Sequence, residues 1–570
     1  MTEAQTRTTA AQIADLLDRS TSMCDVLLAT ARTHPDDDAV RSFTTGQVWT
    51  YDELMARIGS VAQRLQGVGV GRGDTVALMM RNIPEFHVVD AAAMMLGAVP
   101  FSIYNSFSAG QIHYVLANSS AQVVIAEAAF VPVIEEARAL GVSVTHVLTV
   151  EASVDGQLDL SSELAAESTD FDFTAAASAV GGDDLLTLIY TSGTTGPPKG
   201  VELTHAGMLA QLRGIHEYLP LDGGGRQVGF LPAAHVADRW TSHYSALFTY
   251  ANTLTCVADM ADVPAALASV RPTVCGAVPR VWEKLKAGAE SAYPGDLATD
   301  AAADDGLAAA IRQRLGLDQV QWAITGAAPT PLAVIEFFGA LRLPLCEVLG
   351  MSEGSCCVTA NTPTEIRPGS VGRPLREVEV ATAPDGELLL RGPQVMRGYR
   401  ADPVRTAEVI DGDGWLHTGD IATIDADGFI TVVDRKKDIM INSAGKNMSP
   451  ANIEGAVMSA GRLIANVCVI GDARRFVTAL AVVDPATTDC LSRDELREGL
   501  RSQVSAANKN LARVEQIKKF LIVDDVWSPA AELTPTMKMR RNVVHDRYGS
   551  AIEALYDDAI ATDYEVVDVT

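Results

Sequence analysis

The chain has 570 residues, which is too long for one ordinary hydrophobic core, so two or more domains are expected. Hydrophobic residues make up 48% of the chain and charged residues 21%, values typical of soluble globular proteins. The formal net charge of −27 argues against binding of nucleic acid, because nucleic-acid-binding domains normally present a basic face.

No apolar run in the sequence is long enough to cross a bilayer, so no transmembrane segment is expected, although contact with a membrane surface stays open. The N-terminal stretch carries Glu3 and Asp15 and lacks the apolar core of a signal peptide. The eight cysteines form no C-x-x-C pair, which indicates reduced thiols rather than disulfides or a zinc site. These features predict a cytoplasmic protein.

Helical and strand-like patterns alternate in the first hundred residues. Apolar positions between 54 and 65 fall on one helical face, after a predicted cap at Thr50. Residues 75–80 (TVALMM) and 99–104 (VPFSIY) are predicted as strands, and residues 85–98 between them as a helix. This alternation predicts an α/β fold with a layered sheet.

The stretch YTSGTTGPPKG (190–200) follows an apolar run, typical of a buried strand, that ends at Tyr190, and it precedes a second strand-like run that ends at Thr204, a predicted helix cap. A Walker P-loop instead opens directly into a helix and requires Ser or Thr after its lysine, whereas Gly200 follows Lys199 here. Ser192 also lacks the G-x-S-x-G frame of a nucleophile elbow. From these residues alone, a polyphosphate cradle and a flexible loop are equally open.

Two further segments bear on domain organisation. Residues 295–306 (GDLATDAAADDG) are rich in Ala and Asp and of low complexity, so they are expected to form a surface connection. Residues 421–441 contain two alternating runs joined by Asp-Ala-Asp-Gly, which predicts a hairpin, and Pro450 is placed to begin a helix. We place a domain boundary near residues 434–437, with domains at 1–434 and 435–570.

Four charged residues stand in loops where each has an ordinary and a functional interpretation. Glu353 in GMSEGS could hold Mg²⁺ against phosphate oxygens, or be a solvated loop glutamate. Asp420 in GWLHTGD and Arg435 in DRKKD could bind a ribose, or belong to an Asx turn and a solvated charge run. Lys538 in PTMKMRR could neutralise phosphate charge, or be an exposed lysine.

The order of these motifs along the chain is more specific than any one of them. Together they resemble the adenylate-forming superfamily of acyl-CoA synthetases, luciferases and adenylation domains, over about residues 49–548. Finer matches are similar to its long-chain fatty acyl-CoA synthetase branch: FLPAAHVADR (230–239), VPRVWEKL (278–285), ITGAAPTP (324–331) and LTPTMKMRR (533–541).

The resemblance implies a large N-terminal domain of layered α/β subdomains with a β-barrel, and a small mobile C-terminal α+β domain. It implies that a medium- or long-chain fatty acid attacks Mg·ATP to give acyl-AMP and pyrophosphate, and that CoA then takes the acyl group and releases AMP. Mg²⁺ is the implied cofactor, with ATP and CoA as co-substrates. A phosphate cradle is thereby the expected role of residues 191–200.

The resemblance also assigns roles to single residues. Lys538, Glu353, Thr195 and Lys199 would be catalytic, with Glu353 and Thr195 at the metal, His235 beside the acyl pocket, Lys437 at a hinge and Gly445 beside CoA. The remaining ATP- and AMP-binding positions would be Thr191, Ser192, Gly193, Thr194, Gly196, Gly326, Ala327, Ala328, Gly350, Met351, Ser352, Asp420 and Arg435.

Two positions depart from the family pattern. Leu349 stands where an aromatic residue usually packs on adenine, and Asp238 replaces the usual glutamate before Arg239. The first departure implies weaker adenine stacking, and the second a rearranged contact next to His235.

Three alternatives remain beside the fatty acid–CoA ligase. A ligase that loads a carrier protein would carry an insertion, but the stretch from Glu353 to residues 372–374 is short. A non-catalytic binder of acyl nucleotides is disfavoured because Lys199, Glu353 and Lys538 are all retained. A CoA ligase for a sterol side chain or an aryl acid stays open.

Overall fold

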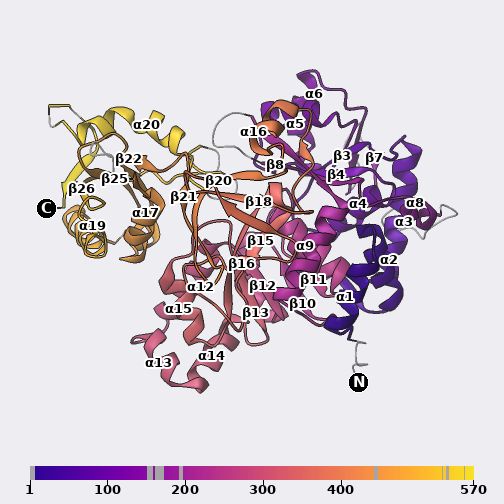
Figure 1. Cartoon of the computed structure of the whole chain (residues 1–570), viewed down its shortest axis with the longest axis horizontal. Helices are drawn as coiled ribbons and strands as arrows, with labels where there is room; N and C mark the ends of the chain where they lie inside the picture. The colour runs from indigo at the N-terminus through magenta and orange to yellow at the C-terminus, as the bar shows by residue number, and fades with distance from the viewer. Residues whose placement is uncertain are drawn as a thin grey trace.

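The protein is described by a computed structural model over residues 7–150, 158–160, 172–191, 197–441, 447–488, 490–528, 531–534, 538–557, 559–560 and 562–569. A large N-terminal part and a smaller C-terminal part lie side by side, as Figure 1 shows. Both parts mix helices and strands, which confirms the predicted α/β class.

An eight-stranded sheet forms the centre of the first subdomain, and its strands run in the order β19-β9-β8-β4-β3-β5-β6-β7. In chain order these are β3 Thr75–Met79, β4 Val99–Ser102, β5 Val123–Ala126, β6 His146–Thr149, β7 Leu158–Asp159, β8 Leu185–Thr191, β9 Lys199–Thr204 and β19 Gly398–Tyr399. Strands β4, β3, β5 and β6 are parallel, whereas β8 and β9 pair antiparallel.

Helices cover both faces of this sheet because side chains alternate along each buried strand. Val76 and Leu78 of β3 pack into one hydrophobic cluster, and Ala77 and Met79 pack into another on the opposite face. The helices and short turns of this region are α1 Ala10–Arg19, α2 Met23–Thr33, α3 Tyr51–Gly67, α4 Pro84–Met95, α5 Ala109–Ser119, η1 Ala128–Phe130, α6 Val131–Ala139, α8 Phe173–Ser178 and α9 His205–Tyr218.

The helix starts predicted in this region are confirmed. The Thr50 side chain accepts a hydrogen bond from the Glu53 N–H and caps α3. The Thr204 side chain accepts one from the Gly207 N–H and caps α9. The predicted strand–helix–strand unit corresponds to β3, α4 and β4.

A second subdomain contains a four-stranded and a five-stranded sheet. The first has β10 Arg226–Gly229, β11 Thr253–Cys256, β1 Asp38–Ser42 and β2 Val48–Thr50; the second has β12 Val274–Ala277, β13 Trp322–Thr325, β14 Leu345–Met351, β15 Cys356–Ala360 and β16 Arg373–Pro374. The connecting helices are α10 Val236–Asp238, the π-helix η2 Arg239–Thr249, η3 Met260–Asp262, α11 Val263–Val270, α12 Pro279–Ser291, α13 Leu297–Ala303, α14 Asp305–Leu315, α15 Leu332–Ala340 and η4 Ser352–Gly354.

Residues 295–306, which were expected to form a surface connection, contain a helix. Leu297–Ala303 is helix α13, and the Asp296 side chain caps it by accepting from the Thr299 N–H. Leu297 and Ala301 are buried one helical turn apart. Alanine is the strongest helix former and aspartate a preferred N-cap, so the same composition that suggested low complexity stabilises a helix.

The region expected to contain a β-barrel is a four-stranded antiparallel sheet of β17 Glu379–Thr382, β18 Glu387–Arg391, β20 Leu416–Ile424 and β21 Ile430–Arg435. Strands β20 and β21 form the predicted hairpin around the Asp425–Gly428 turn. Helix α16 Pro403–Val409 lies between β19 and β20 in the chain.

The C-terminal part packs helices against a four-stranded sheet in the order β24-β25-β26-β27. Its elements are β22 Met440–Ile441, β23 Asn447–Met448, α17 Pro450–Ser459, β24 Ile464–Ile470, β25 Val477–Val483, α18 Pro485–Thr488, α19 Arg493–Asn508, β26 Ile517–Val523, α20 Arg541–Ala554 and β27 Glu565–Asp568. Pro450 begins α17, as predicted.

Two sets of contacts join the C-terminal part to the N-terminal part. The Asp434 carboxylate, on the last strand of the four-stranded sheet, accepts from the Ser449 hydroxyl at 2.5 Å and from the Ala451 N–H at 3.2 Å at the start of α17. Arg462 forms an ion pair with Glu290 of α12 at 2.5 Å. In the part of the chain described here, no helix combines the length and the apolar character needed to span a membrane.

Candidate functional site

The loop between β8 and β9 joins two antiparallel strands, as the sequence predicted. Thr191 at the end of β8 pairs with Lys199 at the start of β9, and the Thr191 hydroxyl donates to the Lys199 carbonyl at 3.5 Å. The predicted phosphate-binding residues Ser192, Gly193, Thr194, Thr195 and Gly196 lie outside the described residues. What is described places Lys199 at the mouth of this loop.

Lys199 and Glu353 are brought together through Tyr399, although they are far apart in the sequence. The Lys199 Nζ donates to the Tyr399 hydroxyl at 3.3 Å and lies 4.5 Å from the centre of its ring. The Tyr399 hydroxyl in turn donates to Glu353 Oε1 at 2.8 Å. Among the described residues, no side chain or backbone N–H donates to Glu353 Oε2, which leaves that oxygen available for a cation.

Asp420 and Arg435 face each other across the hairpin of β20 and β21. They are direct cross-strand partners, and Arg435 Nε lies 2.8 Å from Asp420 Oδ1. Asp420 is 5% exposed, and its burial raises the pKa of the carboxyl group although Arg435 and Lys538 oppose the rise. The structure thus places two predicted ribose-binding residues in one ion pair.

Lys538 belongs to the C-terminal part, yet its charge acts on groups of the N-terminal part. Lys538 is exposed, but nearby protein atoms reduce the solvation of its ammonium group. This partial desolvation, with repulsion from Arg435, lowers the pKa of Lys538 to about 8. Asp420 and Glu353 attract its charge and limit the decrease. Lys538 therefore shares one electrostatic environment with the other candidate residues.

The segment that carries Lys538 is held by a small bridge between chain segments. The Thr534 N–H donates to the Lys538 carbonyl at 2.7 Å, and the Lys538 N–H donates to the Thr534 hydroxyl at 3.0 Å. An isolated β-bridge joins Leu533 to Met539. These contacts fix the backbone from which Lys538 extends.

The predicted adenine loop packs against the strand that leads to Glu353. A Cβ on Gly326 would come within 2.8 Å of the Val348 side chain, and one on Gly350 within 2.4 Å of the Cys356 carbonyl oxygen. Ala327 has a φ of +69°, in the left-handed region. Glycine at 326 thus permits a close approach of Gly326–Ala328 to β14, and glycine at 350 a close approach of β14 to β15.

Gly350 and Met351 end β14, and Ser352 begins the short η4 turn that carries Glu353. Leu349, which departs from the family pattern, is half-buried against the cluster that contains Val358 and Leu388. Its side chain is therefore partly occupied in packing between β14 and the four-stranded sheet.

His235 lies at the N-terminus of α10 and is held in its neutral form. Its Nδ1 accepts from the Ala237 N–H at 3.1 Å, so the proton of the neutral ring resides on Nε2. Burial, reinforced by the charge of Lys538, lowers its pKa to about 4. His235 can therefore offer an N–H donor at ordinary pH, close to a positive charge.

The departure at Asp238 is accompanied by a different pairing of Arg239. Asp238 Oδ1 accepts from the Ser242 hydroxyl at 2.9 Å, and burial raises the pKa of Asp238 to about 7. Arg239 instead contacts Asp90 of α4 at 2.7 Å, and neither side chain of that pair is exposed. His243 also contacts Asp90, at 3.1 Å.

The two predicted C-terminal positions are only partly described. Lys437 follows the end of β21, next to Lys436, whose ammonium contacts Asp385 at 2.6 Å and Glu387 at 3.0 Å. Gly445 lies outside the described residues. The hinge and the CoA contact stay predictions.

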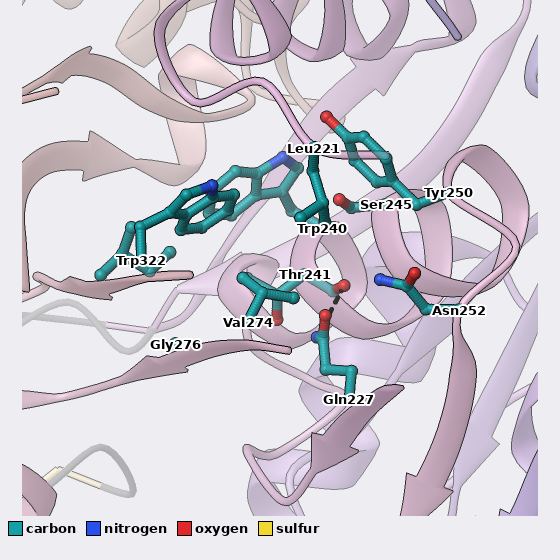
Figure 2. A pocket seen from close by; sticks show the side chains of 11 residues that line it. Leu221, Gln227, Trp240, Thr241, Ser245, Tyr250, Asn252, Val274, Gly276 and Trp322 are labelled. Carbon is teal, nitrogen blue, oxygen red and sulfur yellow. Dashed lines mark hydrogen bonds between the residues drawn. The ribbon is translucent and has the colours of Figure 1, made fainter. Parts of the chain in front are cut away.

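A small cavity lies between the π-helix η2 and strands β12 and β13 (Figure 2). It measures about 30 Å³, room for about one or two water molecules. Its wall is mostly apolar, with one hydrogen bond from the Gln227 amide to the Thr241 carbonyl at 2.9 Å. The lining residues include Leu221, Trp240, Tyr250, Val274, Trp322 and Ile324.

Two protein-family models match the N-terminal and the C-terminal part of the chain. Residues 27–400 match the AMP-binding enzyme family, and residues 437–560 match the AMP-binding enzyme C-terminal domain. The chain belongs to the AMP-binding enzyme family. Within the adenylate-forming superfamily, its relatives place it in the fatty acyl-CoA synthetase branch.

Two curated relatives of this AMP-binding enzyme come from Mycobacterium tuberculosis (strain ATCC 25618 / H37Rv). A protein named as a fatty-acid–CoA ligase, fadD11, is 43% identical over 450 residues, covering 70% of this chain and 79% of the relative. The long-chain-fatty-acid–CoA ligase FadD15 is 33% identical over 562 residues, covering 90% and 93% of the two chains.

A solved structure supports the fold of this AMP-binding enzyme. The adenylation domain of a carboxylate reductase from Mycobacterium chelonae superposes with a TM-score of 0.82 at 19% identity, covering 96% of this chain and 93% of that domain. At this identity the likeness shows the fold alone.

Sequence reasoning missed two charged or polar residues that organise this AMP-binding enzyme. Tyr399 stands alone in RGYR after a loop, where an aromatic residue is usually assigned to the core, and no local pattern marks its two polar contacts. Asp90 did leave a signal, because it is a carboxylate in the middle of helix α4, where its neighbours Val88, Val89 and Ala91 are apolar. A buried charge of that kind indicates a buried partner.

Proposed function

We propose that this protein is an AMP-forming fatty acid–CoA ligase that activates medium- or long-chain acids. The observation that carries the proposal is the convergence of Lys199, Glu353, Asp420 and Arg435 with Lys538, which comes from the other end of the chain. Three cationic and two anionic side chains in one place fit the charge and hydroxyl groups of a nucleotide triphosphate. The names of the relatives support the same activity.

In the first half-reaction, a carboxylate oxygen of the acid attacks the α-phosphorus of ATP. The bond from that phosphorus to the β-phosphate oxygen breaks, and pyrophosphate leaves with the electron pair. Lys199 and Lys538 would stabilise the charge on the phosphate oxygens. The Asp420–Arg435 pair would hold the ribose, with Gly326–Ala328 at the base.

In the second half-reaction, the CoA thiolate attacks the acyl carbon of acyl-AMP, and AMP leaves with the electron pair of the broken C–O bond. The acid is thereby converted from a poor electrophile into a thioester. Gly445 and a hinge at Lys437 are proposed for this step by family resemblance, together with a division of the chain into domains 1–434 and 435–570.

Mg²⁺ is the proposed cofactor. The available oxygen of Glu353, next to Lys199, fits a cation that prefers one or two carboxylates together with substrate phosphates. Thr195 is proposed as a second protein ligand. When bound, Mg²⁺ would neutralise phosphate charge and so help pyrophosphate to leave.

The acyl chain is proposed to enter the cavity between η2 and strands β12 and β13. The cavity is too small for a fatty acyl chain as it stands, so Trp240 or Trp322 would have to move aside. The strands β12 and β13, which form one wall, lead directly into the segments that carry Val278 and Gly326. An apolar chain placed there would therefore have its carboxylate near the nucleotide.

The proposal is tested by following AMP release with purified protein, ATP, Mg²⁺, CoA and a panel of carboxylic acids. We expect kcat/KM to rise from acetate to medium and long saturated chains and then level off, because each buried CH₂ contributes about 0.8 kcal/mol. A higher kcat/KM for benzoate or for a sterol side-chain acid would show that the substrate is an aryl or sterol acid rather than a fatty acid. AMP bound without turnover would indicate a binding protein, and transfer to a carrier protein but not to CoA would indicate the carrier-loading alternative.

The Gly276 position offers a variant that tests the acyl site itself. A Cβ at Gly276 would lie 3.1 Å from the Ile324 side chain, at the cavity wall. Gly276→Val should therefore shift the preference toward shorter acids while the KM for ATP stays unchanged. An unchanged chain-length profile would place the acyl chain elsewhere.

A cytoplasmic location is also proposed, and sedimentation of the enzyme with lipid vesicles would test contact with a membrane.

A further inference from the structure

Tyr399 links two oppositely charged residues without letting them touch. Lys199 carries only donors, so the Tyr399 oxygen must accept from its ammonium group across the 3.3 Å contact. A carboxylate only accepts, so the Tyr399 hydroxyl must give its proton to Glu353 Oε1 across 2.8 Å. One phenol thus supplies one acceptor and one donor, and both directions are fixed.

The backbone around Tyr399 holds this arrangement from both sides. Strand β19 pairs with β9, so Tyr399 lies opposite Val201, two residues after Lys199. The Tyr399 N–H donates to the Thr406 hydroxyl at 2.9 Å. Three residues earlier, the Met396 N–H donates to the Glu353 carbonyl at 2.8 Å. The segment from Met396 to Tyr399 is therefore hydrogen-bonded both to the strand of Lys199 and to the backbone of Glu353.

We propose that Tyr399 is a positioning residue that keeps the Lys199 ammonium and the Glu353 carboxylate from forming a direct ion pair. This inference rests on the proposed function, in which Lys199 meets the phosphates and Glu353 meets the cation. A direct pair would satisfy each group with the other and would have to be broken before Mg·ATP could bind. A neutral phenol between them keeps both groups in place and separately available.

A phenol can do this because it is uncharged and its ring also attracts the ammonium. Lys199 Nζ lies 4.5 Å from the ring centre, within the range of a cation–π contact. Tyr399 is 6% exposed, so water cannot easily take the place of its hydroxyl. Phenylalanine would keep the ring and the cation–π contact but remove the spacer oxygen.

The test measures nucleotide binding by calorimetry, with Mg·ATP and with AMP, which lacks the β- and γ-phosphates. Tyr399→Phe should weaken Mg·ATP binding about tenfold, which corresponds to about 1.4 kcal/mol, because a direct ion pair between Lys199 and Glu353 would have to be broken first. The same variant should bind AMP as the unaltered protein does. A purely structural role for Tyr399 would weaken both ligands equally.

Tyr51→Phe is the matched control. Tyr51 is a buried tyrosine at the start of α3, and its hydroxyl donates to the Leu247 carbonyl at 2.6 Å rather than to Lys199 or Glu353. This variant should bind both nucleotides normally. In a Lys199→Met background, Tyr399→Phe should weaken Mg·ATP binding much less than tenfold, because Glu353 then has no ammonium group at position 199 with which to form an ion pair.

The outcomes separate this inference from the proposed function. If the unaltered protein does not bind Mg·ATP, the proposed function fails first. If it binds Mg·ATP and folded Tyr399→Phe binds it equally well, or loses AMP binding to the same extent, the positioning role is wrong. Should Tyr399→Phe not fold, Tyr399→Trp decides by the same comparison, because indole keeps a ring and a donor but offers no acceptor to Lys199.

Discussion

The N-terminal part of the molecule contains two clusters of charged side chains that differ in burial. We call Asp90, Arg239, His87 and His243 the buried quartet: His87 Nδ1 lies 2.9 Å from His243 Nδ1, and Asp90 contacts both His243 and Arg239. None of these contacts reaches solvent in the part of the chain described here. The site cluster of Lys199, Tyr399, Glu353, Asp420 and Arg435 instead keeps polar atoms at the surface that Lys538 approaches.

The pKa values follow the same division. Burial lowers the pKa of both histidines in the quartet, so they stay neutral. Although burial acts to raise it, Arg239 and His243 hold the pKa of Asp90 below its ordinary value. Beside the site cluster, the pKa of Lys538 is lowered to about 8, and within it the pKa of Asp420 is raised. Paired charges without solvent are typical of groups that hold a fold together, whereas shifted pKa values in a group of converging charges are typical of candidate functional sites.

The largest expected effect concerns Lys538 and separates the two half-reactions. Lys538→Ala should slow acyl-AMP formation by roughly a hundred- to a thousandfold, because a charge that stabilises the phosphate oxygens is lost. Conversion of supplied acyl-AMP and CoA to thioester should be retained. The measurement is pyrophosphate release against thioester formation, with circular dichroism as the control for folding. Equal damage to both half-reactions would contradict this division of labour.

Breaking the buried quartet should destabilise the fold without a specific effect on nucleotide binding. Asp90→Ala leaves Arg239 charged and buried, which costs about 3–5 kcal/mol of unfolding free energy. Urea denaturation of the variant and of the unaltered protein measures this difference in unfolding free energy. The control is Glu379→Gln, which breaks the exposed pair with Arg391 at 2.6 Å and should change stability little. Similar losses in the two variants would remove the distinction between the clusters.

Asp420→Ala should act on the site cluster in the opposite manner, with binding lost and stability largely kept. The expected cost is about 1.5–3 kcal/mol in ATP binding, the value of one hydrogen bond to a charged group. The KM for ATP should rise while the KM for the acid changes little. Unchanged dependence on ATP would remove Asp420 and its partner Arg435 from the site.

The smallest expected effect is a pH dependence from Lys538. Its pKa is about 8, below the ordinary value, so the charged form is present below pH 8 and is lost as pH rises through it. The kcat/KM for acyl-AMP formation should fall about twofold at pH 8 and about tenfold at pH 9. Lys538→Arg keeps its charge at these pH values, so a decline that persists in this variant would assign the titration to another group.

Much of the fold could be predicted because its signals are local. Thr50 and Thr204 cap helices through side chains only three residues from the N–H groups that they accept. The hairpin of β20 and β21 follows from alternation and one turn. The helix within residues 295–306 was not predicted, because their composition suggested only a surface connection, whereas Asp296 as a cap and the spacing of Leu297 and Ala301 indicate α13.

The candidate site was predictable only where one motif holds the residue. Glu353, Asp420 and Lys538 each stand in a short glycine- or proline-containing motif and Arg435 in the charged run DRKKD, and the structure brings these four together. The hydrogen bonds of Tyr399 join residues 46 and 200 positions away, so no local pattern could reveal them. The pairing of Arg239 with Asp90, instead of its neighbour Asp238, is tertiary for the same reason.

The carboxylate of Asp434 has a consequence for any turning of the C-terminal part. It belongs to β21, but it accepts hydrogen bonds from Ser449 and Ala451 at the start of α17, and Lys437 lies between the two partners in the chain. A rotation about Lys437 would therefore have to break these hydrogen bonds and separate Arg462 from Glu290. These contacts stabilise the orientation described here relative to any rotated one. Their combined free energy, rather than the flexibility of the linker, would set how often the C-terminal part leaves this orientation.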